Sequence, residues 1–494
     1  MDSRAVVSAI GRGWQRLSSS ATLRGISVIA SGAVAAQLVI ILASPLLTRL
    51  YTPEEFGFLA VFSALLNTLV VVSSLRYGVA TPLATSDRSG VAIVLLCLSL
   101  LVVFSLCLLG AVALFGEGFA ALVNAPENAV WLYLLPLAIL LAGAFEIFRG
   151  WAIRTRAFSD IAKAKFQQSV AMTLVQLGGF RFGVAALLVG QVVGRFSGSL
   201  RLVRPFSRAR RRQSPPLAVA ELLDEAREYR RFPLYSTWGT LLNVSGRQFP
   251  AIFFAALADP AIAGLYALAQ RILATPLSFV SDAISSVFTS IASRAATPGR
   301  LRHAVESFNM ALCLLASVPI LALMVCGADA FAIIFGENWR TAGVFAAIMA
   351  PWIYLVFVST PLMVVFSVRA RDAELSWFQL ALAVLRVAVL FAGWYLGDAV
   401  LAVALFSGVS AVAYLAMTMR LHCLAGSTAL HTFRPIVGSF CLAAVVLSPM
   451  VLQRIGRVGG DAGMIVAIGV ALLFALGYYG WIASRLSTMT GRTA

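Results

Sequence analysis

Charged side chains interrupt several long apolar stretches of the sequence, and these are the residues whose types could do chemistry. They are Arg76, Glu146, Arg195, Arg247, Arg271, Asp282, Glu306 and Arg386. A charge at the centre of a bilayer costs about 2.5–3.5 kcal/mol on insertion scales, so such side chains normally face a cavity or a partner. A guanidinium keeps its charge in a poor solvent, and its fork of N–H donors matches a phosphate or a carboxylate. The surplus of arginine therefore predicts a site for an anionic substrate.

Four of these arginines are the predicted ligands for the anionic group: Arg76, Arg247, Arg271 and Arg386. Arg247 and Arg271 are too far inside their apolar segments for easy escape to water, which makes them the strongest candidates. Arg195 lies near the predicted inner end of its segment, where a long side chain reaches the interface without any function.

Two acidic residues are predicted to pair with or gate these cations: Glu146 and Asp282. Asp282 lies next to position 283, which matches Arg76 in the internal repeat described below. We therefore expect a charge at nearly the same depth in two related helices, either as a structural ion pair or as a gate that opens when substrate competes for the arginine.

The elements that must position these residues are membrane-spanning helices. Of the 494 residues, 60% are hydrophobic and 12% are charged, against about 25% charged in soluble domains. Apolar stretches of the length needed to cross about 30 Å of hydrocarbon recur along the chain. We predict fourteen spans, at about 25–47, 57–80, 91–114, 129–148, 166–180, 182–200, 232–256, 262–286, 305–326, 342–366, 376–396, 399–419, 435–452 and 463–483. The fold class predicted is all-α, polytopic in the membrane.

The distribution of basic residues predicts the topology. Cytoplasmic loops are enriched in Lys and Arg, and the pattern fits two cytoplasmic termini, with Arg454 and Arg457 breaking it in the last outer loop. The formal net charge of +17 therefore indicates how the chain is oriented in the membrane and not a surface that binds nucleic acid. The predicted regions are a basic N-terminal segment (1–24), an N-lobe of six spans (25–202), a cytoplasmic linker (203–231), a C-lobe of six spans (232–420), and a final pair with the tail (421–494).

An internal repeat supports the two lobes. An offset of 207 matches Pro53 with Pro260 and Gly57 with Gly264 (260 − 53 and 264 − 57), and it also pairs Gly32 with Gly239. An arginine pair recurs at the larger offset of 215, Arg154 and Arg156 against Arg369 and Arg371 (369 − 154). Because six spans separate the copies, the lobes are predicted to cross the membrane in the same sense and to enclose a cavity.

Several chemistries lack their motifs. The sequence has no GK[ST] phosphate loop, no HExxH and no GxSxG, and neither lysine follows a glycine. The six cysteines and three histidines show no metal-ligand spacing. No metal and no cofactor are expected, the chain is predicted not to be an enzyme, and any energy must come from a gradient, the membrane potential or removal of the product.

The segment "PLLTRLYTPEEFGFLAVFSALLNTLVVVSSLRYGVATPLATSD", residues 45–87, resembles the N-terminal signature of Wzx-type polysaccharide flippases, in the multidrug/oligosaccharidyl-lipid/polysaccharide exporter superfamily. The segment "LLVGQVVGRF", residues 187–196, is similar to the sixth span of that family. The arginine of the LRY motif is Arg76, and Gly78 stands where the resemblance leads us to expect an acid.

This resemblance implies alternating access and transfer of an undecaprenyl-diphosphate-linked oligosaccharide from the inner to the outer leaflet of the bacterial inner membrane. Membrane lipids, and a polysaccharide polymerase and glycosyltransferases of the same pathway, are the partners it implies. Two alternatives stay open. One is a cation-coupled drug exporter of the same two-lobed plan, which needs acidic sites where this sequence places mostly basic ones. The other is a polysaccharide polymerase, which needs a large outer loop that the predicted topology lacks.

Overall fold

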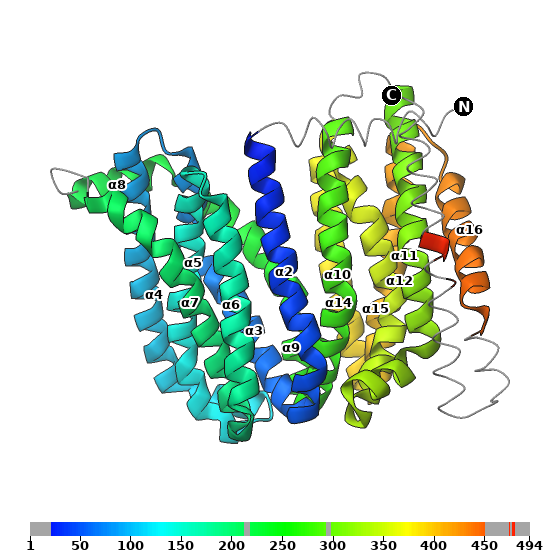
Figure 1. Ribbon diagram of the computed structural model, residues 1–494, viewed down its shortest axis with the longest axis horizontal. Helices are drawn as coiled ribbons and strands as arrows, with labels where there is room; N and C mark the ends of the chain where they lie inside the picture. The colour runs from blue at the N-terminus through cyan, green and yellow to red at the C-terminus, as the bar shows by residue number, and fades with distance from the viewer. Residues whose placement is uncertain (1–20, 212–217, 293–297, 450–473, 475–476, 480–494) are drawn as a thin grey trace. The chain divides into compact units, whose positions relative to one another are not determined.

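Every regular element that the structure describes is a helix. The structure, a computed structural model, describes residues 21–211, 218–292, 298–449, 474 and 477–479 (Figure 1). The long helices are α2 (Ala21–Leu50), α3 (Pro53–Ser73), α4 (Asp87–Leu122), α5 (Leu134–Arg154), α6 (Phe158–Gly178), α7 (Val184–Arg211), α8 (Val219–Glu228), α9 (Thr237–Leu257), α10 (Pro260–Ala292), α11 (Pro298–Phe335), α12 (Arg340–Ser359), α14 (Asp372–Tyr395), α15 (Ala399–Leu424) and α16 (Leu430–Val446). Short helices join them: η1 (Tyr77–Leu83), η2 (Pro126–Tyr133), η3 (Phe180–Phe182), η4 (Phe232–Ser236), η5 (Glu337–Trp339), η6 (Thr360–Met363) and α13 (Val364–Val368).

These helices confirm the predicted all-α membrane fold. Within the described residues, eight helical stretches are long and apolar enough to cross a bilayer. They are Ser31–Leu50, Pro53–Ser73, Asp87–Leu122, Pro126–Arg154, Gly299–Phe335, Glu337–Val368, Asp372–Tyr395 and Ala399–Leu424. Most of the basic N-terminal segment and most of the predicted last span lie outside the described residues, so the number fourteen stays a prediction.

The start of α3 shows how local sequence fixes a helix end. The Glu55 backbone N–H donates to Thr52 Oγ1 at 3.4 Å, and the Thr52 N–H donates to Glu55 Oε2 at 2.8 Å. This reciprocal capping box satisfies two backbone donors that the helix cannot. Pro53 follows at the first helical position, where its missing N–H is not needed.

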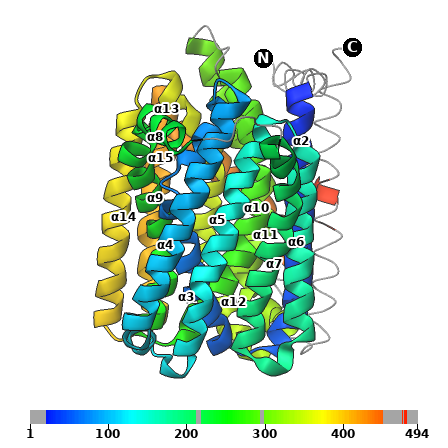
Figure 2. The same cartoon turned by 90° about the vertical axis from the view of Figure 1, so that its left-hand side faces the viewer.

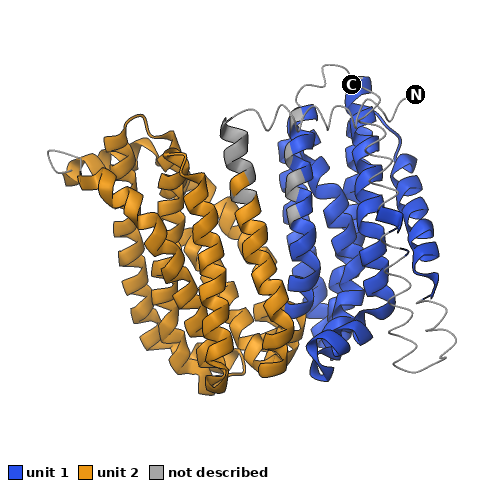
Figure 3. Ribbon diagram, viewed as in Figure 1, with its two compact units in different colours: residues 1–20, 268–494 blue, residues 21–267 orange. Residues whose placement is uncertain are grey.

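The described chain forms two compact units, coloured in Figure 3. Unit 2 holds residues 21–267 and unit 1 holds residues 268–494 together with 1–20, so the division falls inside α10. The predicted lobes instead meet at the linker 203–231, and those lobe boundaries stay a prediction. In unit 2, α9 follows this linker in sequence but packs along α3, which is why the compact unit extends past it.

In unit 2, helices α5, α6 and α7 pack on one another, and the side view in Figure 2 shows them next to each other with α4. Ser199 Oγ of α7 donates to the Leu141 carbonyl of α5 at 2.9 Å. Gln176 Nε2 of α6 donates to the Leu187 carbonyl of α7 at 3.0 Å. These side-chain bonds fix the register between neighbouring helices in a layer where water cannot compete.

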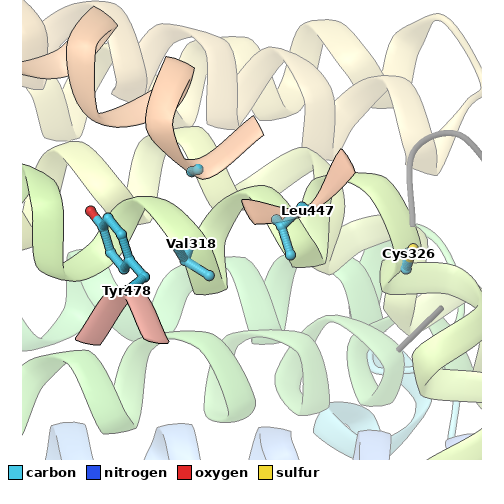
Figure 4. Packing of buried hydrophobic residues seen from close by; sticks show 5 residues of the cluster. Val318, Cys326, Leu447 and Tyr478 are labelled. Atoms are coloured by element: carbon cyan, nitrogen blue, oxygen red, sulfur yellow. The ribbon is translucent and has the colours of Figure 1, made fainter. Parts of the chain in front are cut away.

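Unit 1 is held by a comparable arrangement. Ser407 Oγ of α15 donates to the Ile348 carbonyl of α12 at 2.6 Å. A buried apolar cluster joins α11, α16 and the described residues near the C-terminus, and Figure 4 shows Val318, Cys326, Leu447 and Tyr478. Tyr478 is buried there because its hydroxyl finds a partner, donating to the Leu314 carbonyl at 2.9 Å.

The two units repeat the same contacts. The Ser199–Leu141 bond of unit 2 corresponds to the Ser407–Ile348 bond of unit 1. The residue numbers of the two bonds differ by almost the offset of 207 that relates the two copies of the sequence repeat. Close helix approaches also recur: an added Cβ on Gly179 would lie 2.9 Å from the Ala186 Cβ, and one on Gly393 would lie 2.4 Å from the Ala402 Cα. The repeat is therefore a repeat of helix packing.

One detail of the predicted repeat is wrong. Both turns have a left-handed residue, Arg156 (φ 56°) and Ala370 (φ 54°). The residue after it donates its backbone N–H to a carbonyl of the preceding helix in each case, Ala157 to Ala152 and Arg371 to Phe366. These equivalences require an offset of 214 (370 − 156), so the two arginine pairs at offset 215 do not occupy matching positions. The backbone hydrogen bonds define which residues of the two turns are equivalent, and the arginines do not occupy equivalent positions.

The matched prolines and glycines meet each other within unit 2. An added Cβ on Gly57 would lie 1.8 Å from the Pro260 carbonyl oxygen, and one on Gly264 would lie 2.0 Å from the Pro53 carbonyl oxygen. Each glycine thus faces the proline of the other copy. The first turns of α3 and α10 cross so closely that only glycine fits at either position.

Candidate functional site

Arg76 does not lie within a span, which corrects the prediction. Helix α3 ends at Ser73, and Leu75 and Arg76 take positive φ values of 48° and 57°. Arg76 then precedes η1, and its Nε donates to Ser236 Oγ at 3.1 Å. The guanidinium therefore ties the end of α3 to the segment between α8 and α9.

The predicted match between Arg76 and the position beside Asp282 stays a prediction, although the backbone of the two segments differs. Position 283 in α10, which the repeat assigns to Arg76, lies in an unbroken helix that continues to Ala292. Helix α3 stops because η1 turns back onto α5, where an added Cβ on Gly150 would lie 2.8 Å from the Gly78 carbonyl oxygen. The side chain of Asp282 lies outside the described residues.

Arg247 and Arg271 both lie in helices, as predicted. Arg247 is exposed on α9 of unit 2, and its Nη2 donates to Asn243 Oδ1 one turn earlier. Arg271 lies in α10 within unit 1, is partly buried, and has no hydrogen bond or ion pair to another residue in the part of the chain described. A cation without a carboxylate partner at this position is open to an anionic ligand.

Arg386 lies among aromatic rings in unit 1. Its Cζ is 5.0 Å from the ring centre of Trp352, 5.1 Å from that of Phe406 and 5.8 Å from that of Tyr414. Its Nε donates to Ser410 Oγ at 2.8 Å. Ring faces attract a cation, so α12, α14 and α15 already satisfy much of this guanidinium.

A group of four charged residues lies on α5, α6 and α7 of unit 2, with the side chains of Glu146 and Arg149 43% and 40% exposed. Sequence reasoning named only part of this group as functional. Glu146 and Arg149 of α5 form an ion pair through Arg149 Nε, at 2.9 Å. The charge of Lys165 in α6 interacts with those of Glu146, Arg149 and Arg195, and Arg195 of α7 also interacts with Glu146. We call Arg149, Lys165, Arg195 and Glu146 the basic cluster. It holds three cations and one carboxylate.

The basic cluster lies in the inner part of the predicted membrane layer. At a rise of about 1.5 Å per residue, Glu146 is about 12 Å from the α5 end at Arg154, and Lys165 is about 10 Å from the α6 start at Phe158. Arg195 Nε is buried and has no hydrogen-bond partner within the described part of the chain. Uncompensated buried cations are expensive, and a bound anion would offset that cost.

The placement of the lysines is a sequence signal for this cluster. Lys163 and Lys165 are the only lysines in the sequence, and Lys165 fell just outside the predicted span that begins at 166. Helix α6 begins at Phe158 instead, so Lys165 lies two turns inside it. Arg195 was predicted to reach the interface, but its charge interacts with Glu146 on a neighbouring helix.

Comparisons with known proteins identify the family of the chain and its fold. Residues 46–343 match the family model described as "Polysaccharide biosynthesis protein". The succinoglycan biosynthesis transport protein ExoT of Rhizobium meliloti (strain 1021) is 25% identical over 307 residues, covering 60% of this chain and 59% of the relative. The chain thus matches about three fifths of that relative's length.

Two solved structures share the fold. The lipid II flippase MurJ in an inward closed conformation has a TM-score of 0.71 at 9% identity, with 94% of this chain and 99% of that chain covered. An inward-facing multidrug resistance MATE family transporter of the MOP superfamily has a TM-score of 0.59 at 14% identity, with 79% and 98% covered. At these identities the likeness concerns the fold alone.

Proposed function

Because the chain belongs to the family of polysaccharide biosynthesis proteins, we propose that it is a flippase for an anionic lipid-linked oligosaccharide. The substrate is an oligosaccharide on undecaprenyl diphosphate, moved from the inner to the outer leaflet of the bacterial inner membrane. Both termini are then cytoplasmic. The relative is named as a transport protein, which supports a transporter over a polymerase.

The observation that carries the proposal is the basic cluster. Three cations around one carboxylate leave two positive charges in excess, in a layer where a unit charge pair at 4 Å interacts by about 4 kcal/mol at an effective dielectric constant of 20. A diphosphate brings a comparable negative charge and several acceptor oxygens. A guanidinium group can bind two such oxygens at once through two parallel hydrogen bonds.

Glu146 gives the site a way to hold and release the anion. Arg149 pairs with Glu146 in the structure. A diphosphate that enters from the inner side competes for Arg149, and Glu146 takes Arg149 back when the head group leaves. The exchange keeps the charge of the cluster neutralised in part at each stage.

Arg76, Arg247 and Arg271 remain proposed contacts for the head group and its sugars. Arg247 lies on α9 and Arg271 on α10, the two helices that begin the second copy of the repeat. The prenyl tail stays in lipid while the head group crosses. Arg386 is a weaker candidate because aromatic rings and Ser410 already surround it.

A drug exporter with the same fold is the second candidate, favoured by the likeness to the MATE family transporter. A cationic drug needs acidic side chains in the membrane layer. In the described part of unit 2 the cluster has one carboxylate against three cations, which favours an anion.

The test removes the positive charge of the basic cluster. In cells that make a labelled lipid-linked oligosaccharide, the K165Q/R195Q variant should leave the labelled lipid on the inner leaflet and stop export of the glycan. R227Q is the matched control, since Arg227 is 79% exposed on the cytoplasmic helix α8. Unchanged export by a stably inserted K165Q/R195Q protein would refute the proposed function. Export of cationic dyes by the native chain would support the drug exporter instead.

A further inference from the structure

An open groove of about 830 Å³ runs along the surface of unit 2 between α2 and α6. The residues of α2 that line it are Val28, Ser31, Gly32 and Ala35, and α6 lines it from Ser159 to Leu174. Most of its wall is apolar, formed by side chains such as Phe166, Val170 and Leu174. Phe166 and Leu174 are 44% and 64% exposed, so the groove has wall side chains without a protein partner.

The inner end of the groove is basic. Lys163 of α6 and Arg201 of α7 both line it. Arg201 Nη2 lies 3.4 Å from Asp160 Oδ1, which neutralises one of these two cations. Lys163 is exposed and has no ion pair to another described residue. One positive charge therefore remains at the basic end of the groove, which Ser31 and Ser159 also line.

The length of the groove restricts what can fill it. At about 1.5 Å per residue, Ser159 and Leu174 are about 22 Å apart along α6. One leaflet of a hydrocarbon layer about 30 Å thick is only about 15 Å deep. The groove thus begins at the inner surface and continues past the middle of the bilayer. An acyl chain of an inner-leaflet phospholipid ends before the groove does, whereas a long isoprenoid chain does not.

We propose that this groove holds the isoprenoid chain of a polyprenyl phosphate, with the phosphate on Lys163 and Arg201. The inference rests on the proposed function, since it assigns a place to the lipid half of the same substrate. The groove and the basic cluster lie on two faces of one helix. Lys163 faces the groove and Lys165, two residues on, interacts with the cluster.

This arrangement separates the two halves of the substrate. The phosphate first meets Lys163 and Arg201 at the membrane surface, while the chain lies along α6 in the groove. The head group then has to move only around α6 to reach Arg149, Lys165 and Arg195. The chain stays in contact with apolar wall on both sides of the midplane, so it need not leave the groove while the head crosses.

The experiment measures binding and not transport. The purified full chain in detergent is incubated with undecaprenyl phosphate, or with phosphatidylglycerol, and the bound lipid is counted by native mass spectrometry. Ala171→Trp fills the groove with a large side chain, and Lys163→Gln removes its free cation. We expect each change to weaken undecaprenyl phosphate binding about tenfold, equivalent to about 1.4 kcal/mol, and to leave phosphatidylglycerol binding unchanged.

Matched variants control for folding and for nonspecific lipid contact. Lys163→Arg keeps the charge and should bind undecaprenyl phosphate like the native chain. Leu106→Trp adds the same bulk on α4, where Leu106 is 62% exposed, outside the groove, and should have no effect. If Ala171→Trp leaves undecaprenyl phosphate binding intact, or if both lipids lose affinity equally, the groove is not a polyprenyl site.

The outcome is independent of the transport test. The groove is intact in the K165Q/R195Q variant, because neither residue lines it, so adding Ala171→Trp to that variant should still weaken undecaprenyl phosphate binding even where glycan is no longer exported. Normal glycan export by that variant would overturn the proposed function, and normal lipid binding by Ala171→Trp would overturn the groove.

Discussion

Gly57 faces the carbonyl oxygen of Pro260, and a Cβ added to Gly57 would lie 1.8 Å from that oxygen. The relation is reciprocal, because Gly264 faces Pro53 in the same way. Two segments related by the internal repeat thus meet at the first turns of α3 and α10. Their close approach requires that neither helix carry a side chain there.

We expect Gly57→Ala to destabilise the protein by about 1–3 kcal/mol, the usual range for added bulk in a packed site. The neighbouring atom is a backbone carbonyl, which cannot rotate away as a flexible side chain would. Thermal unfolding in detergent, followed by tryptophan fluorescence, measures the effect. Gly239→Ala on α9 is the control, since a Cβ there meets nothing within 4 Å. Equal stability of the two variants would show that the crossing is looser than described.

Neutralising Arg247 and Arg271 together should abolish export and leave the lipid-linked unit on the inner leaflet. The reason is that a diphosphate moving through the membrane layer needs cations along its route. Leaflet location is read by enzymatic access to the labelled glycan from each side. Full export by a stably inserted R247Q/R271Q protein contradicts the assignment of these two arginines.

Arg386→Met should act on stability more than on transport. The substitution removes the bond to Ser410 and the contacts with Trp352 and Phe406, and cation–π contacts are each worth about 0.5–2 kcal/mol. The melting temperature and the export rate per folded molecule separate the two effects. Native stability combined with lost export would instead return Arg386 to the substrate-binding residues.

Helix α8 should detach from the rest of unit 2 in acid. Arg88 Nε and Nη2 each donate to the Glu221 carboxylate at 2.7 Å. These bonds, and the Ala218 N–H, hold the pKa of Glu221 below its ordinary value. The stabilisation from a lowered carboxyl pKa is complete above the unfolded value of about 4.3 and is lost as pH falls through the folded value.

Amide exchange of α8 at pH 7 and below pH 4 measures this detachment, after correction for the intrinsic rate at each pH. Arg88→Gln should expose the α8 amides already at pH 7, and the exchanged pair R88E/E221R should restore protection. Protection that does not change between pH 7 and pH 3 would mean that other contacts, such as the Tyr77 hydroxyl bond to the Ala226 carbonyl at 3.0 Å, hold α8 in place.

Local features could be predicted from the sequence because they depend on neighbouring residues. The capping box of Thr52 and Glu55 and the proline after it place the start of α3 wherever the helix packs. Apolar stretches of sufficient length become helices because a bilayer leaves the backbone no other partner for its hydrogen bonds. The repeated prolines and glycines also pointed to a real relation, although the sequence could not show that each copy faces the other.

The end of α3 at Ser73 was beyond sequence reasoning. The residues around Arg76 and those around position 283 both continue apolar stretches. The segment at Arg76 nevertheless turns, whereas the segment at position 283 stays helical. The positive φ values of Leu75 and Arg76 are maintained by packing of η1 on α5 and by the bond from Arg76 to Ser236. Those partners lie far away in sequence, so only the folded chain could reveal the turn.

The sequence by itself determined the membrane, the helices, the internal repeat and the surplus of arginine, because hydropathy and charge are sums over the chain. The tertiary structure decided which charges share one site. Lys165 and Arg195 are 30 positions apart (195 − 165), and they interact with Glu146 because α5, α6 and α7 pack in one register. That register is fixed by contacts between helices, such as Ser199 on Leu141, which no single helix specifies.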